Sequence, residues 1–248
     1  MNSNKAKLLV ELNKESTQKK MYELSGYYDE TKLIEFKKSK VKNDDLTHLA
    51  NYYSSDKGTV YGCAHNYTSI YSKIFENHKK ISNDKEIKLF EIGVASASSL
   101  KMWSSYFDNI KITGIDINPS CKDFCMDFDN INIIIGDVLK TDINENYDII
   151  IDDGSHLADD IIETFHKLYS KLNKNGIYVI EDMKTCSNIS YIKSHFKFKN
   201  RKYSDDIDKF IEMNNRNRLD TFFNYLDNNN IKYFKNESGN SEICFIYN

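Results

Sequence analysis

The residues best suited to chemistry lie at 149–156, in the stretch IIIDDGSH. A short apolar run there leads directly into two carboxylates, a glycine, a serine and a histidine. Such a run, bounded by turn residues, is typical of a strand buried on both faces of a parallel sheet. A helix N-cap needs one acceptor, whereas Asp152, Asp153 and His156 offer three titratable groups. Because open α/β sheets bind ligands at the carboxyl ends of their strands, the pattern indicates a binding or catalytic site.

A second acidic pair, Glu181 and Asp182, follows the next apolar run along the chain, 176–180. The short connection between the two runs indicates neighbouring strands, so that both acidic ends meet at one edge of the sheet. Carboxylate oxygens gathered in this way suit Mg²⁺, Mn²⁺ or Ca²⁺ better than zinc, because no thiolate is present. The spacing is therefore compatible with a hard divalent ion at this edge, and alone it favours a bound ion and a metal-free acidic cluster equally.

The stretch EIGVASASSLKMW, 91–103, joins an earlier strand to a helix through small residues. A helix N-terminus after such a turn is a site for an anionic or nucleotide-like group. The dinucleotide fingerprint needs glycines so that the backbone can approach a pyrophosphate. Here Gly93 is followed by Ala95 and Ala97, which argues against NAD or FAD and is compatible with a nucleoside that carries no phosphate.

Two more carboxylates follow the next strands. Asp116 lies near the end of the second strand, at the offset from Glu91 where an acidic residue accepts ribose hydroxyls. Asp137 follows the third strand and is placed to receive an adenine amino group. A simple turn aspartate is the alternative for each residue taken alone.

Two segments outside the predicted strands are rich in aromatic residues. Residues 51–71 contain five tyrosines and His65, and they form either a packed surface loop or a lid over a pocket. Residues 186–202 are basic and aromatic, which favours a solvated loop over an acceptor-binding segment.

Strands that alternate with helices predict the class of fold. We expect core strands at 87–92, 111–117, 131–135, 147–151 and 176–180, a crossover helix at 157–172, a helix at 207–226, and a hairpin at 231–234 and 243–247. This pattern predicts an α/β, Rossmann-like, doubly wound, mostly parallel sheet with a C-terminal antiparallel hairpin. Residues 1–50 are polar with intermittent apolar positions, and we expect them to form an N-terminal helical addition to a domain at 51–248.

Composition excludes several classes of protein. The net charge of −3 gives no sign of general nucleic-acid binding. Five widely spread cysteines do not form the framework of a secreted disulfide protein. No apolar stretch approaches the ~20 residues of a membrane span, and the N-terminus lacks an apolar signal segment. We therefore expect a cytoplasmic protein. Residues 1–50 either cover one end of the sheet or form a subunit contact, which would make the protein a homo-oligomer.

Five motifs together resemble those of a known family: EIGVASASSLKMW, GIDI, GD, IDDGSH and GIYVIEDM. They look like the class I S-adenosylmethionine-dependent methyltransferases, and more narrowly like the metal-dependent sugar O-methyltransferases related to the mycinamicin and elloramycin tailoring enzymes. The segment DKGTVYGCAHNYTSIY is similar to the lid-like loop that precedes the core in that group. The resemblance covers residues 52–183, and the combination of IDDGSH with a downstream IED is its most selective part.

The resemblance implies a role for each matching residue. It implies that Asp153, Glu181 and Asp182 bind a divalent metal, Mg²⁺ or Mn²⁺, and that His156 is the general base, with Asp153 beside it in catalysis. The residues implied to bind S-adenosylmethionine are Glu91, Gly93, Ser99, Asp116, Asp137, Asp152 and Tyr67. His65 and Tyr67 are implied to face the acceptor.

The expected activity follows from these roles. The resemblance implies methyl transfer from S-adenosylmethionine to a sugar hydroxyl, and we expect a nucleotide-linked sugar such as a heptose of bacterial capsular or surface polysaccharide. Alternative acceptors are a small phosphorylated alcohol or a diol metabolite. A non-catalytic scaffold with the methyltransferase fold is the alternative of another class.

Overall fold

The computed structural model describes residues 45–60, 64–184, 207–238 and 241–248 of the 248-residue chain. Its centre is a seven-stranded sheet with the strand order β3-β2-β1-β4-β5-β7-β6. The strands are β1 (Ile87–Ile92), β2 (Ile110–Asp116), β3 (Ile131–Ile135), β4 (Tyr147–Asp152), β5 (Leu172–Ile180), β6 (Tyr233–Ser238) and β7 (Ser241–Tyr247). Strands β1 to β5 are parallel, and β7 pairs antiparallel with both β5 and β6. The predicted doubly wound sheet with a C-terminal hairpin is therefore confirmed.

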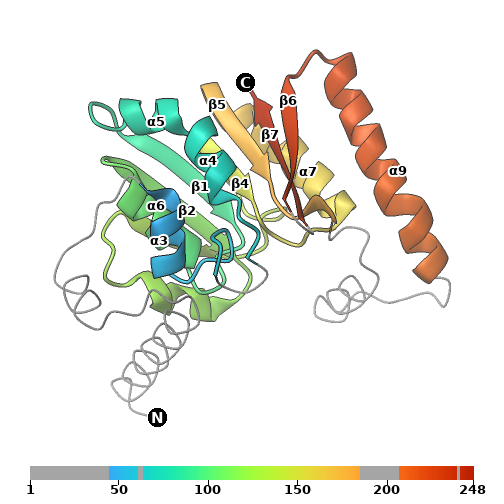
Figure 1. Ribbon diagram of the computed structural model, residues 1–248. Coiled ribbons are helices and arrows are strands. Elements are labelled where there is room, and N and C mark those ends of the chain that lie inside the picture. The colour runs from blue at the N-terminus through green and yellow to red at the C-terminus, as the bar shows by residue number, and fades with distance from the viewer. Residues whose placement is uncertain (1–44, 61–63, 185–206, 239–240) are drawn as a thin grey trace, which may run out of the picture.

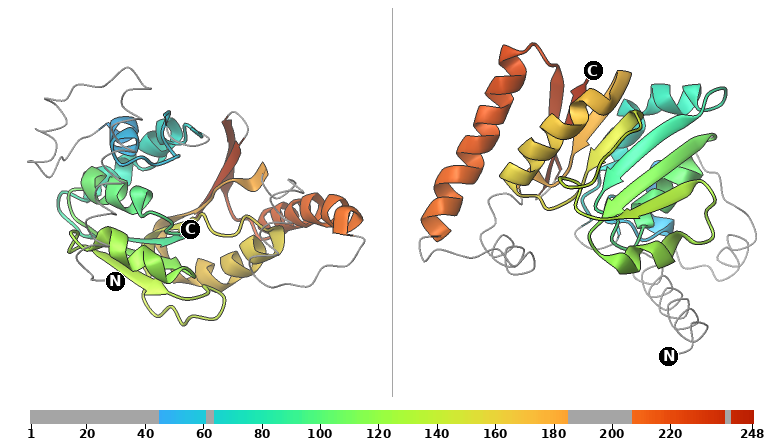
Figure 2. Two further views of the ribbon diagram at one scale, coloured as in Figure 1. Left: turned by 90° about the horizontal axis from the view of Figure 1, so that it is seen from below. Right: turned by 180° about the vertical axis from the view of Figure 1, so that it is seen from behind.

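Helices cover both faces of this sheet (Figures 1 and 2). The described helices are α3 (Leu46–Tyr52), α4 (Thr68–Ile74), α5 (Glu76–Ile81), α6 (Ser98–Tyr106), α7 (Ala158–Leu168) and α9 (Ile207–Asn228), with short 3₁₀ helices at Pro119–Cys125 and Tyr169–Lys171. Residues of α3, α4 and α6 share one buried cluster with inward-facing strand residues, and residues of α7 and α9 share the other. Alternation of buried side chains along each strand explains the two layers, since successive residues point to opposite faces.

The crossover helix is shorter than the sequence pattern predicts. Helix α7 ends at Leu168, and after one 3₁₀ turn β5 already begins at Leu172 rather than at Gly176. The buried side chain of Leu172 pairs with Tyr147 of β4, and a register irregularity then separates this pair from the Ile149–Ile177 pair. Leu172 therefore continues the apolar pattern of the helix in sequence while it belongs to the strand in space.

The N-terminal part of the described chain packs into the same core. Leu46, Leu49 and Ala50 of α3 are buried in the cluster on the α6 face of the sheet. The predicted boundary at residue 50 falls inside α3, so the folded unit begins before residue 51. Residues 1–44 of the predicted helical addition and the basic segment 186–202 lie outside the described residues.

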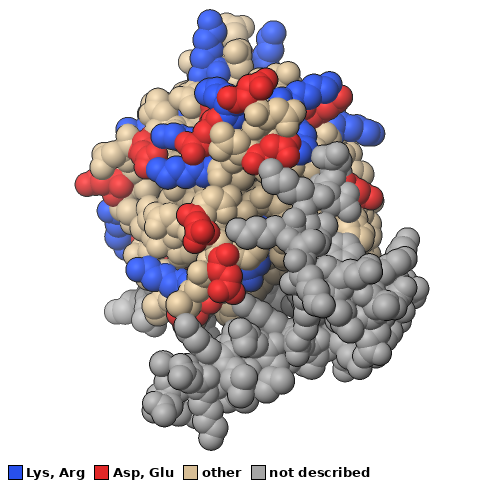
Figure 3. Space-filling view, turned by 90° about the vertical axis from the view of Figure 1, so that its left-hand side faces the viewer, with Lys and Arg blue, Asp and Glu red and all other residues tan. Residues whose placement is uncertain are grey.

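In the face shown in Figure 3, acidic and basic side chains are interspersed. Among the described helices, none has both the length and the apolar character needed to cross a membrane.

Candidate functional site

A pocket of about 300 Å³ opens at the carboxyl ends of the first four strands. Strand β1 lies between β2 and β4, so the chain order of the sheet reverses here, which is where open α/β sheets bind ligands. The pocket is lined by residues Ile92, Gly93, Ile115, Asp116, Ile117, Asn118, Gly136, Asp137, Val138, Leu139, Asp152, Gly154, Ser155, Asp160 and Thr164. We call it the strand-end pocket.

The turn after β1 brings two strand ends into close contact. Gly93 has a φ of +87°, and a Cβ on this residue would lie 2.0 Å from the carbonyl oxygen of Asp153. Only glycine fits this approach. Ala95 and Ala97 also have left-handed backbones, with φ of 47° and 60°, so they follow a path that glycine adopts more readily. Such conformations cost about 1–3 kcal/mol each for other residues and cluster at ligand sites.

Four of the residues predicted to bind the cofactor line this pocket: Gly93, Asp116, Asp137 and Asp152. Asp116 also stabilises the turn, because its Oδ2 accepts hydrogen bonds from the amides of Val94 at 2.8 Å and Ala95 at 3.0 Å. Burial raises the pKa of Asp152 to about 7, so an appreciable fraction of this carboxyl is protonated at neutral pH.

Glu91 and Ser99 lie outside the pocket lining. Ser99 Oγ donates a hydrogen bond to Glu91 Oε1 at 2.5 Å, and Trp103 Nε1 donates to Glu91 Oε2 at 2.8 Å. Glu91 is fully buried, and burial raises its pKa to about 7. Through these hydrogen bonds, Glu91 and Ser99 join β1 to α6. The arrangement does not support their predicted contact with the cofactor, which stays a prediction.

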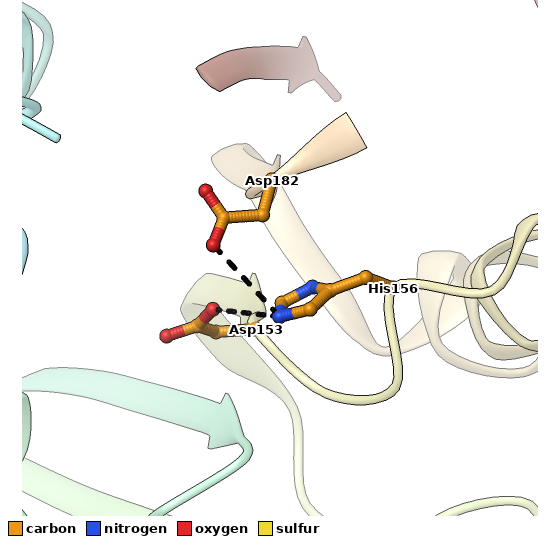
Figure 4. Close-up of side chains that lie close together, drawn as sticks. All are labelled: Asp153, His156 and Asp182. Carbon is orange, nitrogen blue, oxygen red and sulfur yellow. Dashed lines mark ion pairs between the residues drawn. The ribbon is translucent and has the colours of Figure 1, made fainter. Parts of the chain in front are cut away.

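The acidic residues that follow β4 and β5 gather beside the pocket. We call Asp153, His156, Glu181 and Asp182 the acidic corner. His156 Nε2 lies 3.9 Å from Asp153 Oδ1 and 3.8 Å from Asp182 Oδ2, with the imidazole pointing between the two carboxylates (Figure 4). In Asp153, His156 and Asp182, one possible ligand atom from each residue lies within 4.8 Å of those from the other two. His156 and Asp182 have φ of 52° and 56°, unfavourable conformations that are common at functional sites.

Glu181, the fourth residue of the corner, accepts hydrogen bonds from the loop between α3 and α4 and from α4 itself. Lys57 Nζ donates to Glu181 Oε2 at 2.7 Å and to Asp153 Oδ2 at 2.6 Å. The hydroxyl of Tyr71 donates to Glu181 Oε1. Burial alone would lower the pKa of Lys57, but the carboxylates of Asp153, Glu181 and Glu91 outweigh it and raise that pKa well above its usual value. Lys57 is therefore a buried cation that these carboxylates stabilise.

Asp182 is fixed by donors from two distant segments. Tyr67 Oη donates to its Oδ1 at 2.7 Å, and Ser241 Oγ donates to the same oxygen at 2.5 Å. Its Oδ2 lies 3.5 Å from His65 Nε2. Burial would raise the pKa of Asp182, but His156 and the hydrogen bonds from Ser241 and Tyr67 lower it below its usual value. Asp182 is therefore an anion over the whole neutral range.

The structure also places the residues predicted to face the acceptor. The ring of Tyr67 is fully buried and stacks on His65, with centroids 5.2 Å apart. Tyr67 does not line the strand-end pocket, so its predicted contact with the cofactor also stays a prediction. Both side chains border the acidic corner, on the segment that the sequence describes as a possible lid.

Three residues of the site escape the sequence reasoning: Lys57, Tyr71 and Ser241. Lys57 and Tyr71 lie in the aromatic segment, where the sequence shows many polar side chains and singles out neither of them. Ser241 is one of several serines in a polar turn. A cluster of buried carboxylates needs cationic or hydrogen-bonding partners. This requirement is the signal in the sequence that points to residues such as Lys57, Tyr71 and Ser241.

The donor set of the corner fits a hard divalent ion. Two carboxylates and one imidazole converge from two strand ends, and carboxylate oxygens are the preferred ligands of Mg²⁺ and Mn²⁺. Glu181 lies next to this group in sequence, but both of its oxygens already accept hydrogen bonds. The predicted ligand set Asp153, Glu181 and Asp182 therefore stays a prediction, and the geometry adds His156 as an alternative third ligand.

Comparisons with known proteins agree with the fold and the motifs. No family model matches the chain. Demethylmacrocin O-methyltransferase of Streptomyces fradiae is 30% identical over 155 residues, which cover 57% of this chain and 37% of that protein. A rhamnosyl tetracenomycin-C 3'-O-methyltransferase of Streptomyces olivaceus is 33% identical, with 57% and 37% covered. The chain thus spans little more than a third of the length of the curated relatives it matches.

Solved structures give the same result. MycE methyltransferase of mycinamycin biosynthesis, in complex with Mg and SAH, matches with a TM-score of 0.59 and 23% identity over 82% of this chain and 54% of that one. A complex of MycE with Mg, SAH and mycinamycin VI matches with a TM-score of 0.51 and 30% identity over 59% of this chain and 39% of that one. The chain therefore has the fold of the class I S-adenosylmethionine-dependent methyltransferases, and its curated relatives are sugar O-methyltransferases of antibiotic biosynthesis.

Proposed function

We propose that this chain transfers the methyl group of S-adenosylmethionine to a sugar hydroxyl with the help of a divalent ion. One observation carries the proposal: the end of β4 supplies both parts of the site. Asp152 lines the strand-end pocket, and the next residue, Asp153, belongs to the acidic corner. A methyl donor in the pocket and an acceptor at the corner would therefore be neighbours, and proximity of this kind is a large part of catalysis of group transfer.

The acidic corner is the proposed ion site. Asp153 and Asp182 hold the ion in this proposal, and Glu181 is the third ligand predicted from the sequence. A bound Mg²⁺ or Mn²⁺ would orient acceptor oxygens and stabilise the negative charge that develops on the hydroxyl oxygen. The MycE structures were solved in complex with Mg, which supports a divalent ion in this fold.

His156 is the proposed general base. Its Nε2 points toward the space between Asp153 and Asp182, so a hydroxyl that binds there lies within reach of the imidazole. In the neutral form, this nitrogen can accept the proton that the hydroxyl loses during attack on the methyl group. If His156 instead binds the ion, it cannot take that proton through the same nitrogen, and the two roles can be separated by mutation.

The acceptor within this class is also a proposal. The names of two relatives specify a sugar on a larger molecule, a rhamnosyl group on tetracenomycin-C and an olivosyl group on oleandolide. We propose a nucleotide-linked sugar, such as a heptose of surface polysaccharide. Neighbouring hydroxyls on a sugar offer two oxygens that a divalent ion can hold, and this chemistry is shared with the sugars of antibiotic glycosides. Antibiotic glycosides are the competing acceptors.

The test is a methyl-transfer assay with purified full-length chain. Labelled S-adenosylmethionine is incubated with nucleotide-linked sugars, antibiotic glycosides and small diols, each with Mn²⁺ or with EDTA. We expect label in a sugar only when the ion is present. Equal transfer in EDTA would overturn the role of the ion, transfer only to a glycoside or a diol would overturn the nucleotide-linked acceptor, and failure to bind S-adenosylhomocysteine would overturn the proposed cofactor.

A further inference from the structure

A buried lysine lies at the centre of the carboxylates that the proposed chemistry uses. Lys57 is 1% exposed, and its Nζ lies 2.6 Å from Asp153 Oδ2, 2.7 Å from Glu181 Oε2 and 3.9 Å from Glu91 Oε1. The residue comes from the loop between α3 and α4, far in sequence from every carboxylate that it contacts. Burying an ammonium group costs free energy unless its partners compensate the charge. A buried lysine at this position therefore indicates a specific role.

The two carboxylates that are proposed to hold the ion, Asp153 and Asp182, use their oxygens in the same way. Asp153 gives Oδ2 to Lys57, and its Oδ1 faces His156. Asp182 gives Oδ1 to Tyr67 and Ser241, and its Oδ2 faces His156. One oxygen of each carboxylate is therefore held by hydrogen bonds, and the other faces His156, with Asp182 Oδ2 also 3.5 Å from His65 Nε2.

We infer that Lys57 is a positioning residue for the ion site: it holds Asp153 so that Oδ1 faces the ion, and its ammonium group offsets part of the negative charge of Asp153 and Glu181. This inference rests on the proposed function, since it assumes that the corner binds a divalent ion. Partners that orient metal ligands in this way typically change metal affinity 10–100-fold when they are removed.

A different role for Lys57 makes the opposite prediction. If its ammonium group took the place of the ion between Asp153 and Glu181, removal of the lysine would free both carboxylates for the metal, and the ion would bind more tightly. The geometry favours positioning, because Lys57 contacts Oδ2 of Asp153 while the atoms that converge on His156 include Oδ1.

The experiment is a calorimetric titration of Mn²⁺ into the wild type, Lys57→Met and Lys57→Gln, each repeated with S-adenosylhomocysteine. Methionine fills similar space without charge or donor, and glutamine keeps a donor without the charge. Lys79→Met is the matched control, because Lys79 Nζ pairs with Asp108 Oδ2 at 2.7 Å on a helix away from the corner. We expect Lys57→Met to raise the Kd for Mn²⁺ about 10–100-fold, Lys57→Gln to raise it less, and Lys79→Met to leave it unchanged, with S-adenosylhomocysteine affinity the same throughout.

The outcomes separate this inference from the proposed function. A wild type that does not bind Mn²⁺ overturns the ion site and the role of Lys57 with it. Normal Mn²⁺ binding by the wild type with equal or tighter binding by the Lys57 variants overturns the positioning role alone. If Lys57→Met does not fold, as circular dichroism will show, Lys57→Gln decides. If neither variant folds, anomalous scattering from wild-type crystals with Mn²⁺ decides, because an ion seated between Asp153 and Glu181 in place of the ammonium group contradicts the inference.

Discussion

The strand-end pocket and the acidic corner lie side by side but are built in different ways. The pocket is made by residues at or just after the ends of β1 to β4, together with two residues of α7. The corner begins in the same way, after β4 and β5, but its carboxylates are held by Lys57, Tyr67, Tyr71 and Ser241. These partners lie 59 to 124 residues away in sequence from the groups they contact. Because the two regions are built by different residues, we expect mutations in one of them to affect the proposed binding of the cofactor or of the ion without affecting the other.

The largest expected effect comes from the corner. Asp182→Asn removes one of the two carboxylates that face His156 and leaves the strand-end pocket intact. Because a bound ion contributes several kcal/mol of charge stabilisation, we expect turnover to fall about 10³-fold or more. Steady-state rates with saturating Mn²⁺ measure the fall, and a loss of less than tenfold would count against the corner as the ion site.

A second pair of variants decides between Glu181 and His156 as the third ligand. His156→Gln should lower turnover about 10²–10⁴-fold as the loss of a general base, with no change in the Kd for Mn²⁺. Glu181→Gln should raise that Kd if Glu181 binds the ion. The reverse pattern in Mn²⁺ titrations would make His156 the ligand and would remove it as the base.

Asp152 in the strand-end pocket should make the free energy of unfolding depend on pH. Burial raises the pKa of Asp152 to about 7, so the folded chain holds this proton more tightly than the unfolded chain, where the pKa is about 4. The stabilisation is complete below pH 4 and is lost as the pH rises through 7. Between pH 4 and 8, wild type should lose up to about 4 kcal/mol relative to Asp152→Asn. Urea unfolding in EDTA measures the difference, and parallel curves for the two proteins would refute it.

The smallest effect is expected at Ser241. Ser241→Ala removes one of the two donors to Asp182 Oδ1 and leaves Tyr67 in place. A hydrogen bond to a charged group contributes about 1.5–3 kcal/mol, and Tyr67 retains part of this, so we expect the Kd for Mn²⁺ to rise a few-fold. An effect as large as that of Lys57→Met would show that the two carboxylates are not positioned independently.

The contrast between the two regions also explains what the sequence could predict. Apolar runs gave β1 and β3 with the observed ends, and Asp116, Asp137 and Asp152 could be placed at the pocket because each lies at or just after the end of a strand. Neighbouring strands β4 and β5 then brought Asp153 and Asp182 together, as expected. Position relative to a strand end is local information, and the sequence carries it directly.

The remaining features depend on long-range packing. No periodicity marks Lys57 among the polar residues of its segment. Its proposed role follows only from the contacts that its side chain makes with the residues after β4 and β5. The motif that contains Glu91 predicts that this residue contacts the cofactor. Its side chain instead points into the core and accepts hydrogen bonds from Ser99 and Trp103. Which way a side chain turns at a strand end is set by neighbours that are distant in sequence.

In the mechanism that we propose, the acidic corner holds a divalent ion and the strand-end pocket independently holds the methyl donor. The most direct test is a paired calorimetric titration of Asp153→Asn with S-adenosylhomocysteine and with Mn²⁺. Lys57 keeps Glu181 as a partner in this variant, so we expect a folded protein. We predict wild-type affinity for S-adenosylhomocysteine together with loss of Mn²⁺ binding. Unchanged Mn²⁺ binding, or loss of S-adenosylhomocysteine binding in a folded variant, would contradict this mechanism.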